Sequence, residues 1–373
     1  MTQRRTPPFR ADHVGSLLRP AALHEVRRQA AQGAITAEQL RAAEDEAIRD
    51  VVDMQRRVGL RSATDGEFRR SSWHMDFIYQ LEGISASDEK LQVKFRNADG
   101  ELEFSPSGLK VDGTVGLGHT IFGDHFDFLK STVDPEVTPK LTIPSPSMVY
   151  YRGGRAAVDP SVYPDLEDFF ADLGAAYAAQ IAAVGDRGCR YLQLDDTSLA
   201  YLNDPAQREF VAEMGFDPQT LHLRNIRTMN AAIAAKPDGM AITTHLCRGN
   251  YRSSWAAEGG YDFVAEALFN ELDVDGYFLE FDDERSGGFE PLRFVPKGKH
   301  VVLGLVTTKR GELETVDGLR RRIEQASQYI DVDQLCLSPQ CGFSSTEEGN
   351  DITEDEQIRK LELIVETAEQ VWG

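Results

Sequence analysis

Two hydrophobic patterns alternate along most of this chain. Short runs such as "CRYLQLDD" (189–196) and "MAITTHLC" (240–247) are apolar at most positions before a polar end. Longer segments such as "DLEDFFADLGAAYAAQIAAVG" (165–185) carry apolar residues three or four positions apart. The first pattern is typical of parallel strands buried on both faces of a sheet, and the second of amphipathic helices. The alternation predicts an α/β fold.

The pattern predicts eight strands. They contain the sequences "ADHVGS", "RSATDGE", "PKLTIPSPS", "CRYLQLDD", "MAITTHLC", "GYFLEFDD", "KHVVLGLVTTK" and "QLCLSPQCG". Eight strand–helix units favour a (β/α)8 TIM barrel, and a doubly wound open sheet is the alternative. Because no low-complexity linker divides the chain, we expect a single domain over residues 1–373.

The regular alternation is interrupted near residues 84–125. This region is rich in glycine and aspartate, and "VKFRNADGELEF" (93–104) alternates on both sides of a turn sequence. Alternation around such a turn predicts a β-hairpin. We therefore expect an insertion into the barrel that contains a hairpin.

Charge and hydropathy narrow the classes of partner. The formal net charge is −21, whereas binding to nucleic acid requires a basic surface that replaces counterions around phosphate. The sequence shows no apolar stretch of the roughly 20 residues needed to cross a bilayer and no apolar segment after its first arginines. We expect a cytoplasmic protein that binds neither nucleic acid nor membrane.

Four cysteines are too few for a disulfide framework in a cytoplasmic protein, and such residues are more often buried, metal-bound or catalytic. Cys247 follows His245 by two positions in a predicted strand, so both side chains project from one face. Cys189 and Cys336 start or lie within strands and are expected in the core. Cys341 follows the last strand.

Polar residues gather where the predicted strands end, and these ends meet at one mouth of a barrel. The residues are His13, Gly15, Ser16, Asp65, Glu67, Asp195, Asp196, His245, Cys247, Glu280, Asp282, Thr308, Lys309 and Cys341. An imidazole, two thiolates and a carboxylate from three strand ends form a set of ligands that binds zinc in preference to magnesium or calcium. The set is His245, Cys247, Glu280 and Cys341. The alternative is that the two cysteines are small buried apolar residues.

Three motifs carry a family resemblance. "THLCRG", "LEFDD" and "SPQCGF", in this order, resemble the zinc-binding sequence of the C-terminal barrel of cobalamin-independent methionine synthase. The resemblance implies a TIM barrel and Zn²⁺ held by His245, Cys247, Glu280 and Cys341.

The resemblance extends over residues 11–345 and implies a substrate site. "HVGSLLRP" is similar to the family segment whose backbone meets the amino-acid carboxylate, which implies this role for Gly15 and Ser16. "TDGEF" and "LQLDD" resemble the elements that hold the substrate ammonium, which implies this role for Glu67 and Asp195. "FRRSSWHMDF" adds Trp73 and His74 as candidate contacts.

The chain departs from the family in three respects. The family enzyme has two fused barrels, and this chain is long enough for one. Tyr150, in "IPSPSMVYY", stands where the family places a tryptophan under the pterin, and a tyrosine could still stack. Lys309, in "GLVTTKRGE", stands where the family has a proton-donating histidine; a lysine could act as the acid or hold an anionic donor.

The implied activity is a zinc-dependent methyltransferase in methionine biosynthesis that methylates a thiol. The expected partners are homocysteine and a methyl donor, folate or another. Lys309 and Asp195 are the candidate catalytic residues. The alternatives are alkyl transfer to another thiol such as coenzyme M, a non-catalytic zinc-binding module, and a metal-free decarboxylase on the related porphyrinogen barrel. A homo-oligomer is an open alternative to a monomer.

Overall fold

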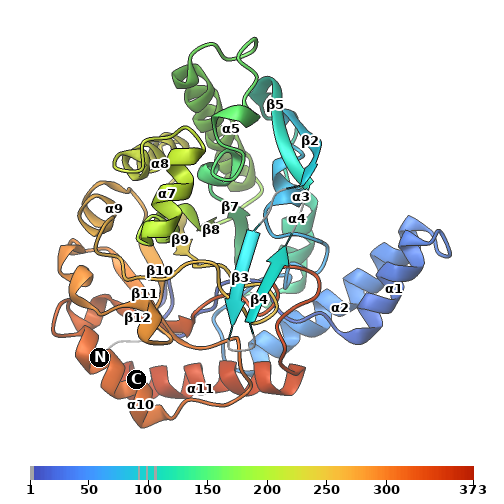
Figure 1. Cartoon of the computed structure of the whole chain (residues 1–373). Helices are drawn as coiled ribbons and strands as arrows, with labels where there is room; N and C mark the ends of the chain where they lie inside the picture. The colour runs from blue at the N-terminus through green and yellow to red at the C-terminus, as the bar shows by residue number, and fades with distance from the viewer. Residues whose placement is uncertain (1–3, 91–92, 98–99, 105–106) are drawn as a thin grey trace.

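A sheet of six parallel strands forms the centre of the molecule (Figure 1). The computed structural model describes residues 4–90, 93–97, 100–104 and 107–373. The order in the sheet is β12-β11-β10-β9-β8-β7, so sequential strands are neighbours. The strands are β7 (Leu141–Pro144), β8 (Tyr191–Asp196), β9 (Ala241–Leu246), β10 (Gly276–Glu280), β11 (His300–Val306) and β12 (Leu335–Pro339).

Two further strand positions extend the sheet towards a barrel. β1 (Ser62–Ala63) pairs in parallel with β6 (Thr138–Pro139), which leads into β7. At the other edge, Ala11 bridges to Leu337 of β12. The segments at these two edges contact each other, because Thr64 Oγ1 donates to the Gly15 carbonyl at 2.6 Å and the Leu17 backbone N–H donates to the Gly66 carbonyl at 3.1 Å. The eight predicted strand positions and the barrel are thus confirmed. Among the described residues, no strand pairing joins the Ala11 segment to β1, so the sheet is not closed at this point.

Helices surround the strands, as Figure 1 shows. The predicted helix over 36–59 is α2: Thr36 caps its first turn in a capping box with Gln39, and Gly59 follows its end with φ 93°. The α-helices are α1 (Ala21–Ala31), α2 (Ala37–Arg57), α3 (Met75–Ile78), α4 (Gly123–Thr132), α5 (Leu166–Asp186), α6 (Ser198–Tyr201), α7 (Pro205–Glu213), α8 (Leu221–Ile233), α9 (Ala265–Glu271), α10 (Val316–Ala326) and α11 (Glu354–Trp372). The 3₁₀ helices are η1 (Pro146–Val149), η2 (Arg155–Ala157), η3 (Glu284–Ser286), η4 (Glu290–Phe294) and η5 (Val332–Gln334).

The core explains the apolar strand pattern. Every residue of β8, β10 and β12 is buried, because the helices cover one face of the sheet and the barrel interior covers the other. Cys189 and Cys336 are both buried, as predicted, and burial raises the pKa of each thiol to about 12. None of the described helices is both long and apolar enough to cross a membrane.

The predicted insertion is present and contains the predicted hairpin. β2 (Glu82–Lys90) pairs antiparallel with β5 (Ser107–Gly116), and between them β3 (Val93–Asn97) pairs antiparallel with β4 (Gly100–Phe104). The predicted turn at residues 98–99 lies outside the described residues, as do residues 91–92 and 105–106 of the insertion.

The β3–β4 hairpin lies against the loop that follows β9 (Figure 1). The Arg96 and Trp255 backbones exchange two hydrogen bonds of 2.7 and 2.9 Å. Val93 and Phe95 are buried while Lys94 between them is exposed, so one face of β3 is turned inwards. The insertion thereby supplies part of the wall of the cavity described next.

Candidate active site

A cavity opens at the carboxyl ends of the barrel strands, where functional groups of this fold are expected. The structure brings most of the predicted site residues to its wall: Ser16, Glu67, Trp73, His74, Asp195, His245, Cys247 and Cys341. The hairpin contributes Val93 and Phe95. Residues that were predicted at the ends of separate strands therefore line one cavity.

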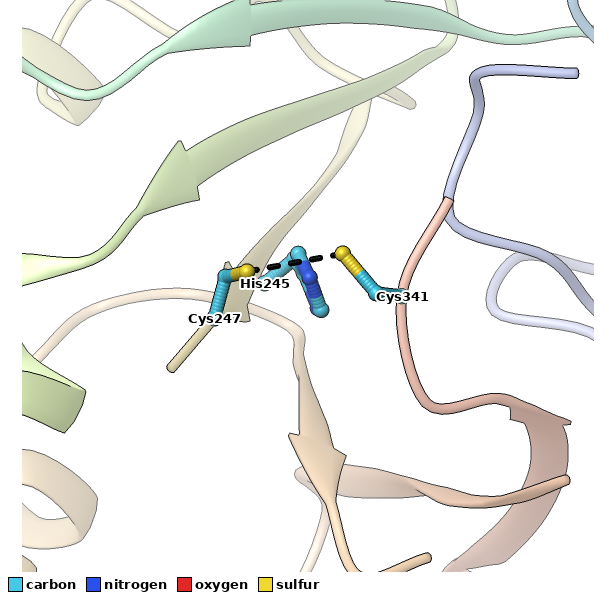
Figure 2. A group of neighbouring side chains, drawn as sticks. All are labelled: His245, Cys247 and Cys341. Atoms are coloured by element: carbon cyan, nitrogen blue, oxygen red, sulfur yellow. Dashed lines mark hydrogen bonds between the residues drawn. The ribbon is translucent and has the colours of Figure 1, made fainter. Parts of the chain in front are cut away.

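His245, Cys247 and Cys341 form a compact group of metal-ligand donors (Figure 2). One donor atom from each lies within 4.8 Å of the other two, and the two sulfur atoms are 3.4 Å apart. His245 belongs to β9, Cys247 follows it, and Cys341 follows β12. The predicted shared direction of His245 and Cys247 is confirmed.

The electrostatics of this group fit a cation. Both ring nitrogens of His245 are buried and lack a hydrogen-bond partner among the described residues. The neighbouring Cys247 thiol, and then His245, lower the pKa of Cys341 well below its ordinary value, which favours a thiolate there. Buried polar atoms without a hydrogen-bond partner are unusual, and a cation held between the imidazole and the two sulfurs would give these nitrogens a partner. Two thiols and an imidazole suit a soft or borderline ion such as zinc.

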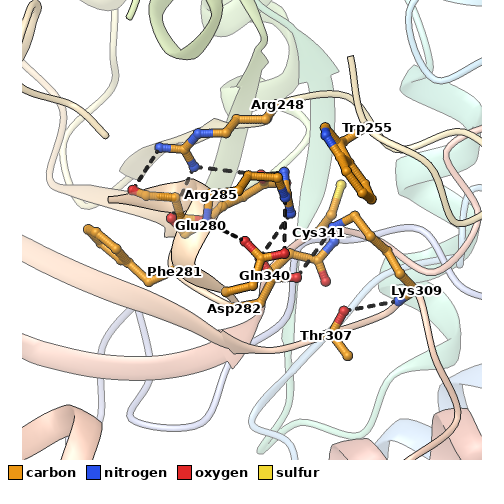
Figure 3. Close-up of polar contacts among 12 residues, drawn as sticks. Arg248, Trp255, Glu280, Phe281, Asp282, Arg285, Thr307, Lys309, Gln340 and Cys341 are labelled. Atoms are coloured by element: carbon orange, nitrogen blue, oxygen red, sulfur yellow. Dashed lines mark hydrogen bonds and ion pairs between the residues drawn. The ribbon is translucent and has the colours of Figure 1, made fainter. Parts of the chain in front are cut away.

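Glu280 lies at the end of β10, close to this group but not part of it. Its side chain is fully buried, and neither carboxylate oxygen has a hydrogen-bond partner among the described residues. Two guanidinium groups face Oε2: Arg248 Nη1 at 3.6 Å and Arg285 Nη1 at 4.0 Å (Figure 3). Burial raises the pKa of Glu280 above its ordinary value, and the charge of Lys309 opposes that shift. The structure thus places three of the four predicted ligands together and the fourth beside two arginines.

Glu67 occupies a strained backbone position. Its φ is 63°, in the left-handed region that residues with a Cβ seldom adopt. Thr142 Oγ1 donates to Glu67 Oε1 at 2.7 Å, and Arg70 Nη1 lies 3.6 Å from the same oxygen. Backbone strain of this kind persists where the surrounding structure fixes a functional side chain. Here it aims a buried carboxylate into the cavity.

Asp195 is the second carboxylate in the cavity. It is the second-last residue of β8, pairs with His245 of β9, and accepts a hydrogen bond from Gln193 Nε2 at 2.6 Å. Burial is the main reason that the pKa of Asp195 is raised to about 7. Glu67 and Asp195 together offer acceptors for a cationic group.

Gly15 and Ser16 lie next to Glu67. A Cβ on Gly15 would stand 2.6 Å from Thr142 Cγ2 and 3.3 Å from Glu67 Oε1, and Gly15 has φ 149°. Ser16 accepts a hydrogen bond on Oγ from the Ser344 backbone at 3.3 Å. A glycine is therefore required for the chain to pass this close to the carboxylate.

The structure does not bring Tyr150 to the cavity. Its ring is fully buried, its hydroxyl donates to Asn225 Oδ1 at 2.6 Å, and its ring packs on Phe170. The chain turns through η1 after β7, and this turn places Met148 at the cavity wall instead. The expectation that Tyr150 stacks on a substrate is therefore corrected: Tyr150 faces the layer of α5 and α8.

Lys309 also lies away from the cavity wall. Its Nζ is 3.4 Å from Asp282 Oδ2, and its side chain is 6% exposed. Figure 3 shows Lys309 beside Cys341 and near the group that contains Arg248 and Arg285. Its proton-donating role stays a prediction, and its observed contact is an ion pair with Asp282.

Several wall residues were not predicted. They include Met148, Arg152, Thr197, Tyr201, Asn250 and Tyr251, besides Val93 and Phe95. Tyr251 contacts Phe95 with ring centroids 5.4 Å apart. Tyr251 and Asn250 stand four and three residues after Cys247, so their position in the loop after β9 was the available signal.

Comparisons with known proteins agree with this geometry. Residues 120–370 match the family described as "Cobalamin-independent synthase, Catalytic domain". The uncharacterized protein YxjH of Bacillus subtilis is 48% identical over 372 residues, covering 99% of this chain and 96% of the relative. Methionine synthase of Pyrococcus furiosus is 22% identical, covering 88% of this chain and 85% of that protein.

Two solved structures have the same fold. A putative vitamin-B12 independent methionine synthase from Listeria monocytogenes superposes with a TM-score of 0.79 at 38% identity, covering 99% of this chain and 100% of that chain. A B12-independent methionine synthase from Shewanella sp. W3-18-1, in complex with selenomethionine, gives 0.72 at 18% identity, covering 99% and 98%. The chain therefore belongs to the cobalamin-independent methionine synthase family, matches its catalytic domain, and is a methyltransferase-like enzyme.

Proposed function

We propose that this protein is a zinc-dependent methyltransferase that transfers a methyl group from a small-molecule donor to the sulfur of homocysteine, giving methionine. The observation that carries the proposal is the convergence of His245, Cys247 and Cys341, with donor atoms within 4.8 Å of one another at the floor of a cavity. These three residues would hold the ion, with Glu280 as the fourth ligand. Zinc, when bound, lowers the pKa of a coordinated thiol and so supplies a thiolate at neutral pH.

The two cavity carboxylates would orient the amino acid. Glu67 and Asp195 would accept hydrogen bonds from its ammonium, and the Gly15–Ser16 backbone would meet its carboxylate. Arg70 and Thr142 fix the Glu67 carboxylate through the contacts described above. Holding the amino acid at both charged groups directs its sulfur towards the cysteines and limits its motion during reaction.

Methyl transfer is a direct displacement in this proposal. The new bond joins the substrate sulfur to the methyl carbon. The bond from that carbon to the donor breaks, and its electron pair stays on the donor. The outer cavity, between Trp73 and Phe95, would receive the donor. Its aromatic walls, the half-buried Trp73 and the buried Phe95, would limit the access of water to the reacting sulfur.

Assay of the zinc-loaded protein tests the proposal. Homocysteine would be supplied with 5-methyltetrahydrofolate, methylcobalamin or S-methylmethionine in turn, and methionine measured by mass spectrometry. We expect methionine from at least one donor and none after chelation of the metal. Coenzyme M serves as the comparison thiol. It has no ammonium, and its sulfonate would face Glu67 and Asp195, so we expect no detectable methylation of it. Methylation of coenzyme M alone, or of neither thiol by any donor, contradicts the proposal.

Substitution of Gly15 with alanine should weaken homocysteine binding. The added methyl group would meet Thr142 and Glu67 and would retain an unfavourable φ, so we expect the free energy of unfolding to fall by about 1–3 kcal/mol. Because Glu67 must shift, KM for homocysteine should also rise. Gly239→Ala is the matched control, since Gly239 has φ 77° but no atom within 4 Å of its added Cβ. This control should lose stability with an unchanged KM, and an equal KM in both variants would contradict the assignment of Gly15.

A further inference from the structure

Arg285 follows β10 and lies in η3. One nitrogen of its guanidinium group, Nη1, makes no hydrogen bond to the described residues. Its Nε donates to Asp283 Oδ2 at 3.0 Å, and its Nη2 donates to Asp282 Oδ1 at 3.3 Å. Its Nη1 is buried, has no hydrogen-bond partner among the described residues, and lies 4.0 Å from Glu280 Oε2. Figure 3 shows this guanidinium group next to the Glu280 carboxylate.

Arg248 approaches the same carboxylate but is already saturated. Its Nε donates to the Gly259 carbonyl at 2.8 Å, and its Nη2 lies 3.3 Å from the carbonyls of Gly260 and Ser286. Its Nη1 donates to the Tyr261 hydroxyl and to the Glu280 carbonyl, each at 3.1 Å. Arg248 therefore fixes the backbone at the end of β10, and its charge is 3.6 Å from Oε2.

The nearby acids do not use the free donor of Arg285. Asp282 lies 3.4 Å from Lys309 Nζ as well as accepting from Arg285 Nη2. Asp283 accepts from Nε and from the Arg285 backbone. The face of the guanidinium group lies over the Trp255 ring at 4.9 Å, which restricts its rotation. Among the described residues, the carboxylate that Nη1 faces without a hydrogen bond is that of Glu280.

We propose that Arg285 is a positioning residue for Glu280: Nη1 receives the Glu280 carboxylate when the substrate thiolate takes its place among the metal ligands. The inference rests on the proposed function and adds the residue that makes ligand exchange feasible. A fully buried carboxylate that leaves a cation needs a second positive partner, because an unpaired buried charge is strongly unfavourable. The 4.0 Å separation from Nη1 allows Glu280 to reach this partner with a small side-chain rotation.

A purely structural role for Arg285 predicts something different. In that case Arg285 would stabilise the 282–286 loop through Asp282 and Asp283, and its loss would weaken metal binding and thiol binding together. Exchange of Glu280 for the thiolate predicts instead that the affinity for the thiol falls while the affinity for the metal does not. Without Nη1, Glu280 has no free hydrogen-bond donor to turn to, because those of Arg248 are already in use. Glu280 would then stay with the ion more firmly, and thiol binding would weaken.

Cobalt substitution of the full-length protein separates these cases, because Co²⁺ absorption reports the ligand set without turnover. The proteins compared would be wild type, Arg285→Gln, Arg285→Lys and the control Arg293→Gln. Arg293 also stacks on an aromatic ring, Phe294, at 4.4 Å, but it is exposed and donates to the Glu290 carbonyl. Chelator competition gives the Kd for Co²⁺, and titration with homocysteine gives the Kd for the thiol.

We expect Arg285→Gln to weaken homocysteine binding about tenfold or more, the range of effects for groups that support metal ligands. Its Kd for Co²⁺ without thiol should stay equal to that of wild type or decrease. Arg285→Lys should restore part of the thiol affinity, and Arg293→Gln should match wild type. A thiol Kd within twofold of wild type, or parallel losses of both affinities, overturns the proposal.

A double-mutant cycle keeps the test decisive if Arg285→Gln is poorly folded. In a Glu280→Gln background no carboxylate charge has to be received, so Arg285→Lys should have no further effect on thiol affinity. An undiminished effect there refutes the role of Arg285. If wild-type Co²⁺ protein shows no spectral response to homocysteine, the proposed function fails rather than this inference alone.

Discussion

Cys341→Ser is expected to abolish tight metal binding and to lower methyl transfer by about 1,000-fold or more, since a catalytic metal contributes several kcal/mol to the barrier. We expect this loss because the substitution replaces the sulfur atom that would bind the metal. The Cys341 sulfur lies 3.4 Å from that of Cys247, and its pKa is lowered well below its ordinary value. A serine hydroxyl stays protonated at neutral pH and is a poor zinc ligand. Elemental analysis and the methionine assay measure the two losses.

Cys336→Ala is the matched control for this substitution. Cys336 belongs to β12, the strand that precedes Cys341, and packs against Val14, Phe278 and Val302 instead of the ligand group. We expect this variant to lose some stability because it leaves a small cavity, but to bind one metal ion per chain. A Cys341→Ser protein that keeps a full equivalent of tightly bound zinc would remove Cys341 from the ligand set.

Glu67→Gln is expected to lower kcat/KM for homocysteine by about 100-fold. Hydrogen bonds to a charged group contribute about 1.5–3 kcal/mol, and the amide keeps the size of the side chain while removing its charge. Thr142 Oγ1 can still donate to the amide oxygen at the position of Oε1, so the local structure should persist. Steady-state kinetics with each thiol give the comparison.

The decisive comparison for Glu67 uses 4-mercaptobutyrate, which is homocysteine without its ammonium. The wild-type protein should use it poorly, and Glu67→Gln should use it about as well as wild type does. Equal losses for both thiols would mean that Glu67 has a structural role through Arg70 and the strained turn, and would contradict ammonium recognition.

The strand ends were predictable because parallel strands buried on both faces leave an unmistakable apolar pattern. Once "MAITTHLC" and "QLCLSPQCG" are placed as strands of one barrel, Cys247 and Cys341 must lie at the same mouth. The contact between them, 94 residues apart in sequence, followed from that rule.

The irregular segments were less predictable. Tyr150 was misplaced because Pro146, after β7, starts a 3₁₀ turn, and this turn changes which side chain faces the cavity. Phe95 could be placed on a hairpin but not on the cavity wall, since that depends on pairing between Arg96 and Trp255. The left-handed backbone of Glu67 has no signal in its residue type.

The location of Cys341 also constrains how the protein matures in the cell. The ribosome adds this sulfur 94 residues after that of Cys247 and beyond the last barrel strand, so His245 and Cys247 are made well before Cys341. Chains grow at about 5–20 residues per second during synthesis, which leaves an interval of several seconds between the synthesis of Cys247 and that of Cys341. The group of His245, Cys247 and Cys341 is therefore complete only after β12 has been made.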